Sequence, residues 1–279
     1  PLLGGRRGAN PPVLTVSRCR FLPGEDHPDQ GGEIMKMFIH IALLASLASP
    51  LAWSAGTVQV YTPDSEKPKT LTNARHLLDL VGQPRLAKSW WTGAVISERQ
   101  ATIVAEQKHQ ALLARLSGLA QQEDADDAAA ITSLRQQLQA VKVTGRQKVN
   151  LDPDEVRVAE NGNPSLEGDY TLWLPAQPST VTVMGLLSSP GKKPFTPGRD
   201  VASYLDEQSL LSGADKSYAW VVYPDGHTQK APVAYWNKRH IEPMPGSIIF
   251  VGFADHFWTK AYDGLNADIL RSLIQRIPE

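Results

Sequence analysis

The sequence has a single cysteine, Cys19, which lies ahead of the first methionine, Met35. The chain beyond Met35 therefore has no disulfide, no thiolate metal site and no cysteine to acylate after a signal segment. Neither sign of charge is in surplus, since 28 Lys and Arg residues stand against 29 Asp and Glu. A nearly neutral chain has no global field to capture a polyanion, so nucleic acid is not an expected partner.

A hydrophobic run long enough to span a bilayer is not found at the start of the chain. The apolar run from Phe38 to Leu51 is about 14 residues, whereas a spanning helix needs roughly 20. One positive charge precedes this run, and the small residues Ala52 and Ser54 follow it. This layout predicts a signal peptide over 35–54, cleaved near Ser54, and a periplasmic protein with no stable membrane anchor.

Residues 1–34 precede the first methionine and are rich in Gly, Pro and Arg. We interpret them as a non-native, translated upstream leader and leave them out of the fold. The chain after the signal peptide suits two domains of about 100 residues each.

The first expected domain covers 55–175 and opens with alternating residues at 57–61, typical of a half-buried strand. Ser97 and Gln100 have capping-box spacing ahead of a helical pattern, and a second helical pattern follows a short polar turn. These patterns predict an antiparallel helical hairpin over 97–141, inserted in the domain. Alternation resumes after Gly145 and predicts an edge strand that ends at Pro153.

The second expected domain covers 179–260, after a proline-containing linker. Its pattern reads as two strands, a helix capped by Asp200 and two more strands, which fits a β-grasp sheet packed on one helix. The segment 264–277 is amphipathic. We expect this helix to dock on the second domain; a membrane-surface or oligomer role is the alternative.

Several motifs carry a family resemblance over 56–279. They include Val143-Thr144-Gly145-Arg146, Leu151-Asp152-Pro153-Asp154, Trp236-Asn237-Lys238-Arg239-His240, and the segments 56–58, 90–91, 168–172, 211–216 and 245–247. The chain resembles the GfcC family of group 4 (O-antigen) capsule biosynthesis proteins. The resemblance implies an α+β fold with two β-grasp domains similar to those of the capsule exporter Wza, a helical hairpin inserted in the first and a C-terminal amphipathic helix. It implies no characterised catalytic activity.

Common catalytic signatures are missing from the sequence. It has no G-x-S-x-G elbow, H-E-x-x-H pair or Walker loop, and its histidines after position 54 are scattered, so neither a metal nor a cofactor is expected. Asp152 and Asp154 are the candidate carboxylate pair for glycoside cleavage. The other interpretation of Asp152-Pro153-Asp154 is a turn with solvated carboxylates.

The candidate residues for binding polysaccharide or a partner are Arg146, Asp152, Asp154, Trp90 and Trp91, and each has two interpretations. Arg146 follows the hairpin, so its guanidinium could face a crevice and bind carboxylates or sugar hydroxyls, or it could be one more cation on an edge strand. Trp90 and Trp91 are adjacent and point different ways in an extended segment, so one of them could present a face to sugar rings. Core packing is the other role for these indoles.

The expected function is that of a monomeric, non-catalytic periplasmic accessory protein in capsule assembly or export. Its partner would be capsular polysaccharide or a component of the export machinery. The alternative is a polysaccharide-processing enzyme with a cleft around Arg146 and Asp152 or Asp154.

Overall fold

The computed structural model describes residues 56–65, 67–255 and 260–279. The expected leader and signal peptide, including the cleavage position at Ser54, lie outside these residues. The described strands form a four-stranded and a five-stranded mixed sheet, which confirms the α+β class with two β-grasp-like domains. Among the described helices, none has both the length and the apolar character needed to cross a membrane.

The first sheet has the strand order β2-β1-β4-β3. Its strands are β1 (Gly56–Tyr61), β2 (Lys69–Ala74), β3 (Val95–Glu98) and β4 (Asp169–Trp173). β1 pairs antiparallel with β2 and parallel with β4, and β3 pairs antiparallel with β4. Val58, Val60 and Leu172 point into a core shared with two short helices, α2 (Leu77–Val81) and α5 (Pro153–Val158). The alternation in β1 arises because only one face of the sheet meets this core.

The second sheet has the order β6-β5-β9-β7-β8. Its strands are β5 (Thr180–Gly185), β6 (Gly191–Pro194), β7 (Tyr218–Val222), β8 (Thr228–Pro232) and β9 (Ile248–Val251), and α6 (Val201–Leu205) lies between β6 and β7. β5 pairs antiparallel with β6 and parallel with β9, which repeats the arrangement of the first sheet. The pattern did not predict β8, whose exposed Gln229 and Lys230 leave little alternation to read.

The helical hairpin follows β3 and consists of α3 (Arg99–Ala120) and α4 (Ala125–Gln139). Its predicted capping box is wrong, because Ser97 belongs to β3. The N-cap is Glu98, whose carboxylate accepts hydrogen bonds from the backbone N–H groups of Gln100 and Ala101, each at 2.7 Å. A carboxylate at this end also suits the positive pole of the helix dipole.

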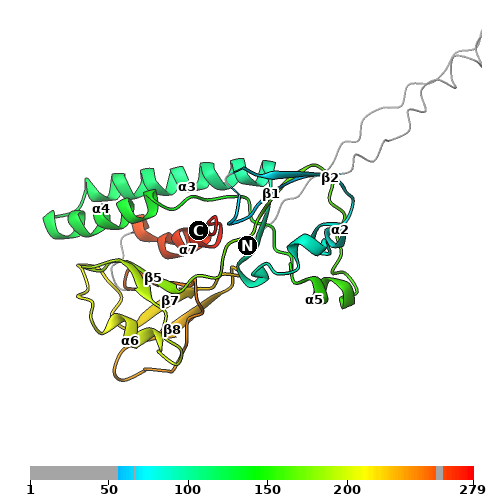
Figure 1. Ribbon diagram of the computed structural model, residues 1–279. Coiled ribbons are helices and arrows are strands. Elements are labelled where there is room, and N and C mark those ends of the chain that lie inside the picture. The colour runs from blue at the N-terminus through cyan, green and yellow to red at the C-terminus, as the bar shows by residue number, and fades with distance from the viewer. Residues whose placement is uncertain (1–55, 66, 256–259) are drawn as a thin grey trace, which may run out of the picture. The chain divides into compact units, whose positions relative to one another are not determined.

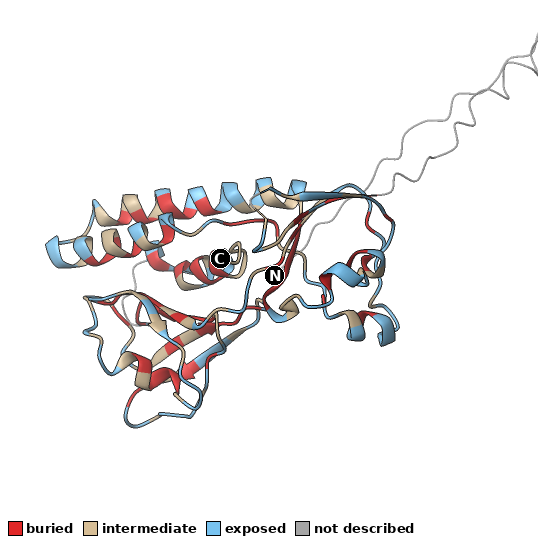
Figure 2. Ribbon diagram, in the orientation of Figure 1, coloured by how far each residue is buried: buried red, intermediate tan, exposed pale blue. Residues whose placement is uncertain are grey.

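The hairpin is inserted in the first domain by sequence, yet its apolar face packs with the second sheet. Leu116, Leu134 and Leu138 belong to the same buried cluster as Val183 and Phe250. The last helix, α7 (Leu265–Ile274), contacts both α3 and β7 and is largely buried in Figure 2. In Figure 1 it lies between the hairpin and the second sheet. The apolar face of the predicted amphipathic helix is therefore used within the molecule.

Two polar contacts fix this packing. The side-chain amide of Gln137 in α4 donates to the Gly185 carbonyl at 2.9 Å and accepts from the Gly185 N–H at 2.8 Å. Gly185 has a φ of 118°, and an added Cβ would lie 2.0 Å from the Val251 oxygen, so only glycine fits there. On the other side of the hairpin, Arg115 pairs with Asp268 of α7 at 2.8 Å.

Replacing Leu116 by Ala should destabilise the protein, because it opens a cavity in the cluster that holds the hairpin. We expect a loss of about 2–5 kcal/mol in the free energy of unfolding, measured by urea denaturation. The matched control is Val104→Ala in the same helix, where the side chain is 39% exposed and the change should be within about 0.5 kcal/mol. Equal losses in the two variants would contradict this assignment of the core.

Stability should also depend on pH through His109. This buried imidazole of α3 is hydrogen-bonded to the Ser272 hydroxyl of α7 at 2.6 Å and donates to the Leu138 carbonyl. Burial lowers the pKa of His109. As pH falls below about 6.5, the unfolded chain binds this proton before the folded protein does, so the free energy of unfolding should fall. Above about pH 7 the contribution should be fully present.

His109→Gln tests this by urea unfolding between about pH 5 and 8. The variant should lose the part of the pH dependence that His109 contributes. Parallel pH profiles for the variant and the wild type would show that His109 is not responsible.

Candidate functional site

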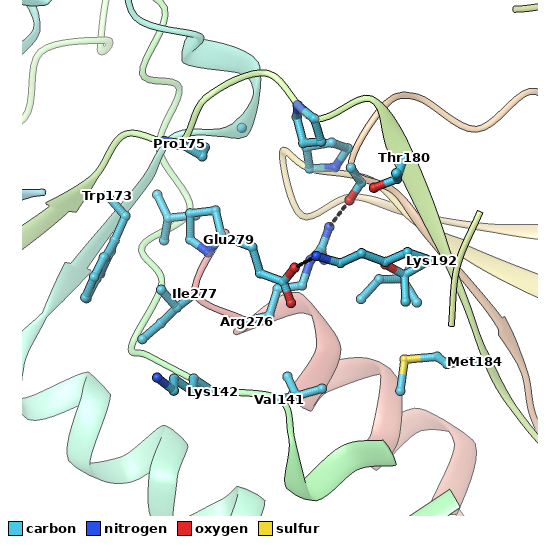
Figure 3. Close-up of a pocket in the computed structure, with 18 of the residues that line it drawn as sticks. Val141, Lys142, Trp173, Pro175, Thr180, Met184, Lys192, Arg276, Ile277 and Glu279 are labelled. Atoms are coloured by element: carbon cyan, nitrogen blue, oxygen red, sulfur yellow. Dashed lines mark hydrogen bonds and ion pairs between the residues drawn. The ribbon is translucent and has the colours of Figure 1, made fainter. Parts of the chain in front are cut away.

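A cleft of about 970 Å³ lies in the described part of the chain. Its walls come from four segments that are distant in sequence: the first domain with its linker, the end of α4, the second sheet, and the tail after α7. Figure 3 shows Val141 and Lys142 on the hairpin side of the cleft, Met184 and Lys192 on the side of the second sheet, and Trp173 at another wall. The site therefore exists only when hairpin, tail and both sheets are assembled.

Arg146 lines this cleft, directly after the point where the chain leaves the hairpin. Gly145 passes so close to α3 that an added Cβ would lie 2.2 Å from the Thr102 nitrogen. The Arg146 backbone N–H donates to the Gln275 side chain at 2.8 Å. Its guanidinium donates to the Pro224 carbonyl at 2.8 Å and to the Ile274 carbonyl at the limiting distance of 3.5 Å. Burial lowers the pKa of Arg146, and the nearby Asp225 opposes this shift.

Arg276 lies beside Arg146 and was not a sequence candidate. Its guanidinium donates to the carbonyls of Leu273 at 3.0 Å and Gly246 at 3.1 Å, and more weakly to those of Val222 and Tyr223. Burial, together with the charge of Arg146, lowers the pKa of Arg276 to about 10. Arginine keeps its charge at neutral pH, so both guanidinium groups are cations, and backbone carbonyl oxygens hold them.

Aromatic side chains form another part of the cleft. Trp90 lines it and packs on Gly93, where an added Cβ would meet the indole ring at 2.0 Å. Trp173 also lines it and stacks on Tyr61, with ring centroids 4.1 Å apart. The neighbouring Trp91 points elsewhere and packs on the core of the first domain. The structure thus brings Arg146 and Trp90 together and leaves Trp91 out.

Asp152 and Asp154 do not line the cleft. The edge strand predicted after Gly145 is wrong beyond an isolated bridge between Ser97 and Arg146. Asp152 instead caps α5 and accepts from the Asp154 N–H at 2.9 Å, while Asp154 pairs with Arg157 at 2.7 Å. Both carboxylates are exposed. The hypothesis that they form a catalytic pair beside Arg146 is therefore wrong in its geometry.

A smaller cavity of about 450 Å³ lies between α3 and the polar face of the first sheet. Thr57, Gln59 and Thr171 line it. Trp173 and Ile277 line both cavities, so the two cavities are neighbours on either side of these two residues. Over the described residues, no group of three or more His, Cys, Asp or Glu side chains is placed to hold a metal ion.

Two β-grasp-like domains joined by a linker, with an inserted hairpin and a cationic, aromatic cleft at the junction, define a two-domain β-grasp-like protein with a candidate binding site. Comparison with known sequences gives the family. Residues 54–177 match "Capsule biosynthesis GfcC, N-terminal", and residues 189–278 match "Capsule biosynthesis GfcC C-terminal". The chain belongs to the GfcC family of capsule biosynthesis proteins.

A relative from Escherichia coli (strain K12), described as "Uncharacterized protein YjbG", is 68% identical over 239 residues. The matched region covers 86% of this chain and 98% of the relative. The similarity thus covers most of this chain and nearly all of the relative.

A variant at Arg146 should separate binding from stability. The folded environment disfavours the charge of Arg146, so Arg146→Met, which keeps the apolar stem, should change the free energy of unfolding by less than about 1 kcal/mol. Lys148→Met, an exposed position on the same segment, is the control. If the free energy of unfolding, measured by urea denaturation, instead fell by more than about 3 kcal/mol, Arg146 would be a residue that stabilises the fold.

Proposed function

We propose that this protein is a periplasmic, non-catalytic accessory factor in capsule assembly or export that binds polysaccharide in the cleft around Arg146. Membership of the GfcC family connects the chain to capsule biosynthesis. The signal-peptide pattern at 35–54 supports the periplasmic location, and we propose that the mature protein acts as a monomer.

The observation that carries this proposal is the position of the Arg146 guanidinium in a cleft that also contains Trp90 and Trp173. A sugar offers hydroxyl oxygens to the planar fork of an arginine. The C–H face of its ring packs on an indole, which has a large apolar surface. Few polar groups converging in a mostly apolar concavity are typical of a ligand site.

The shape of the site favours a polymer over a single sugar. The two cavities, of about 970 and 450 Å³, share the walls formed by Trp173 and Ile277. In this proposal a glycan chain lies along both, with successive units meeting the cationic cleft and then the smaller cavity, which Arg99, Glu106 and Asp169 also line. The neighbouring positions of the two cavities support binding along a chain.

The rival hypothesis, a polysaccharide-processing enzyme, required Arg146 with Asp152 or Asp154. Glycoside hydrolysis in its common form needs two carboxyl groups flanking the bond that breaks. Glu279 is the only carboxylate among the cleft-lining side chains in the described ranges. The lining residues of the cleft are therefore sufficient for binding, whereas glycoside hydrolysis would need a second carboxyl group there.

A second candidate function is docking on a component of the export machinery. Tyr235 is 99% exposed and Trp236 is 74% exposed, side by side in the loop between β8 and β9. Paired aromatic residues in water are typical of protein contact surfaces. The terminal helix is a poorer docking element, because Ile269, Leu270 and Leu273 of α7 are buried.

Calorimetric titration with oligosaccharides of the strain's own surface polysaccharide tests the proposal. The wild type should give saturable heat, and Arg146→Met and Trp90→Ala should each weaken binding about tenfold or more, since a lost stacking or charged contact costs roughly 1.4 kcal/mol. Trp236→Ala is the matched control and should bind normally. No heat from the wild type would contradict the proposal, and loss of capsule export in Trp236→Ala cells would favour docking.

A further inference from the structure

We infer that the cleft takes an acidic polysaccharide, one whose sugars carry carboxylates, and that the Glu279 side chain competes with it as an internal ligand. This inference rests on the proposed function and adds the chemical class of the glycan. It is carried by the charge balance of the cleft and by the place of the tail in it.

Charges of one sign gather in the cleft although the chain as a whole is nearly neutral. Lys142, Arg146, Lys192 and Arg276 line it, and in the described ranges Glu279 is the only carboxylate that does so. In a concave site with low-dielectric walls, such a group of cations focuses a positive potential on whatever enters. A neutral glycan would make no use of this potential.

The charge of the two arginines is offset only in part, by Asp225 for both and by Glu279 for Arg276. Their hydrogen-bond acceptors are backbone carbonyls, which orient a guanidinium without neutralising it. Asp225 lies in the turn between β7 and β8. It accepts hydrogen bonds from the His227 backbone N–H at 3.0 Å and the His227 ring at 3.2 Å. Within the described residues neither arginine forms an ion pair, so an anion that enters the cleft meets their positive potential.

The tail shows which kind of anion fits. The Ile277 N–H donates to the Lys142 carbonyl at 2.8 Å, which fixes the tail along the end of the hairpin. From there Glu279 extends its carboxylate to the Lys192 ammonium, and Figure 3 shows this ion pair within the cleft next to Arg276. The Glu279 carboxylate thus already occupies the place where a sugar carboxylate would bind.

The Lys192–Glu279 pair is suited to exchange. Its side chains are 56% and 78% exposed, so water and salt reach both partners. Exposed pairs of this kind contribute little to stability because solvent screens them. A glycan carboxylate with additional contacts to the arginines and indoles can therefore displace Glu279 from Lys192.

The test compares two probes of matched length, an oligogalacturonate that carries a carboxylate on each sugar and a neutral malto-oligosaccharide. Calorimetric titration of the purified protein should show binding of the acidic probe at least about tenfold tighter, decreasing with salt as expected for ion pairing. Glu279→Gln should tighten binding of the acidic probe about threefold to tenfold. Lys192→Gln should weaken it by a similar factor. Glu160→Gln, an exposed charge change outside the cleft, is the matched control and should have no effect.

The possible outcomes distinguish a failure of the acidic-glycan inference from a failure of the proposed glycan-binding function. If the neutral probe binds as tightly as the acidic one, the acidic class is overturned and glycan binding itself stands. If Glu279→Gln behaves like Glu160→Gln while the acidic probe still binds, competition by the tail is overturned. If neither probe nor the strain's own polysaccharide binds, the proposed function fails as well.

Discussion

The cleft depends on the apolar packing of the helical hairpin against the second sheet and α7. Leu116, Leu134 and Leu138 bury completely in this cluster, and each such side chain contributes about 1.5–3 kcal/mol relative to full exposure. The packing fixes the end of α4 over β5, where the Gln137 side chain forms hydrogen bonds with both the N–H and the carbonyl of Gly185. Because the chain leaves the hairpin at this place, Lys142 and Arg146 are brought to the second domain although they belong to the first in sequence.

The same packing determines where the chain goes after α7. The helix is held between hairpin and sheet by its apolar face, by Asp268 on Arg115 and by Ser272 on His109. It ends at Ile274, and the tail then turns so that Arg276 reaches the carbonyls of Leu273 and Gly246. Arg146 and Arg276, which are far apart in the sequence, thereby lie side by side. Their desolvation and the repulsion between their like charges both disfavour this arrangement. Natural proteins keep such unfavourable charges at sites that bind ligands.

Much of the fold could be predicted from the sequence because its signals are local and periodic. Alternation in β1 and helical spacing in α3 and α4 reflect one buried face each, so they predict the elements directly. The sequence-based predictions were wrong where one residue type is common in two kinds of local structure. Pro153 ends a strand and also begins a helix at its first position, and here it begins α5 with Asp152 as the cap.

The candidate site was less predictable, because it is made of side chains from segments far apart in the sequence. Arg146 was found from its place after the hairpin, which is a topological signal. Arg276 falls within the amphipathic segment 264–277, yet α7 ends two residues earlier, so helical spacing does not predict where the Arg276 side chain points. Lys192 and Trp173 had no distinguishing pattern. Only the tertiary structure shows that these side chains share a cleft with Arg146.

Hydrogen–deuterium exchange of the purified protein, with and without oligosaccharides of the strain's own surface polysaccharide, tests most directly whether this cleft is the binding site. If it is, the ligand should slow exchange in residues 140–146, 175–184 and 274–279 and leave the exposed loop at 233–240 unchanged. Protection confined to the loop at 233–240, or no protection anywhere, would contradict the assignment of the cleft.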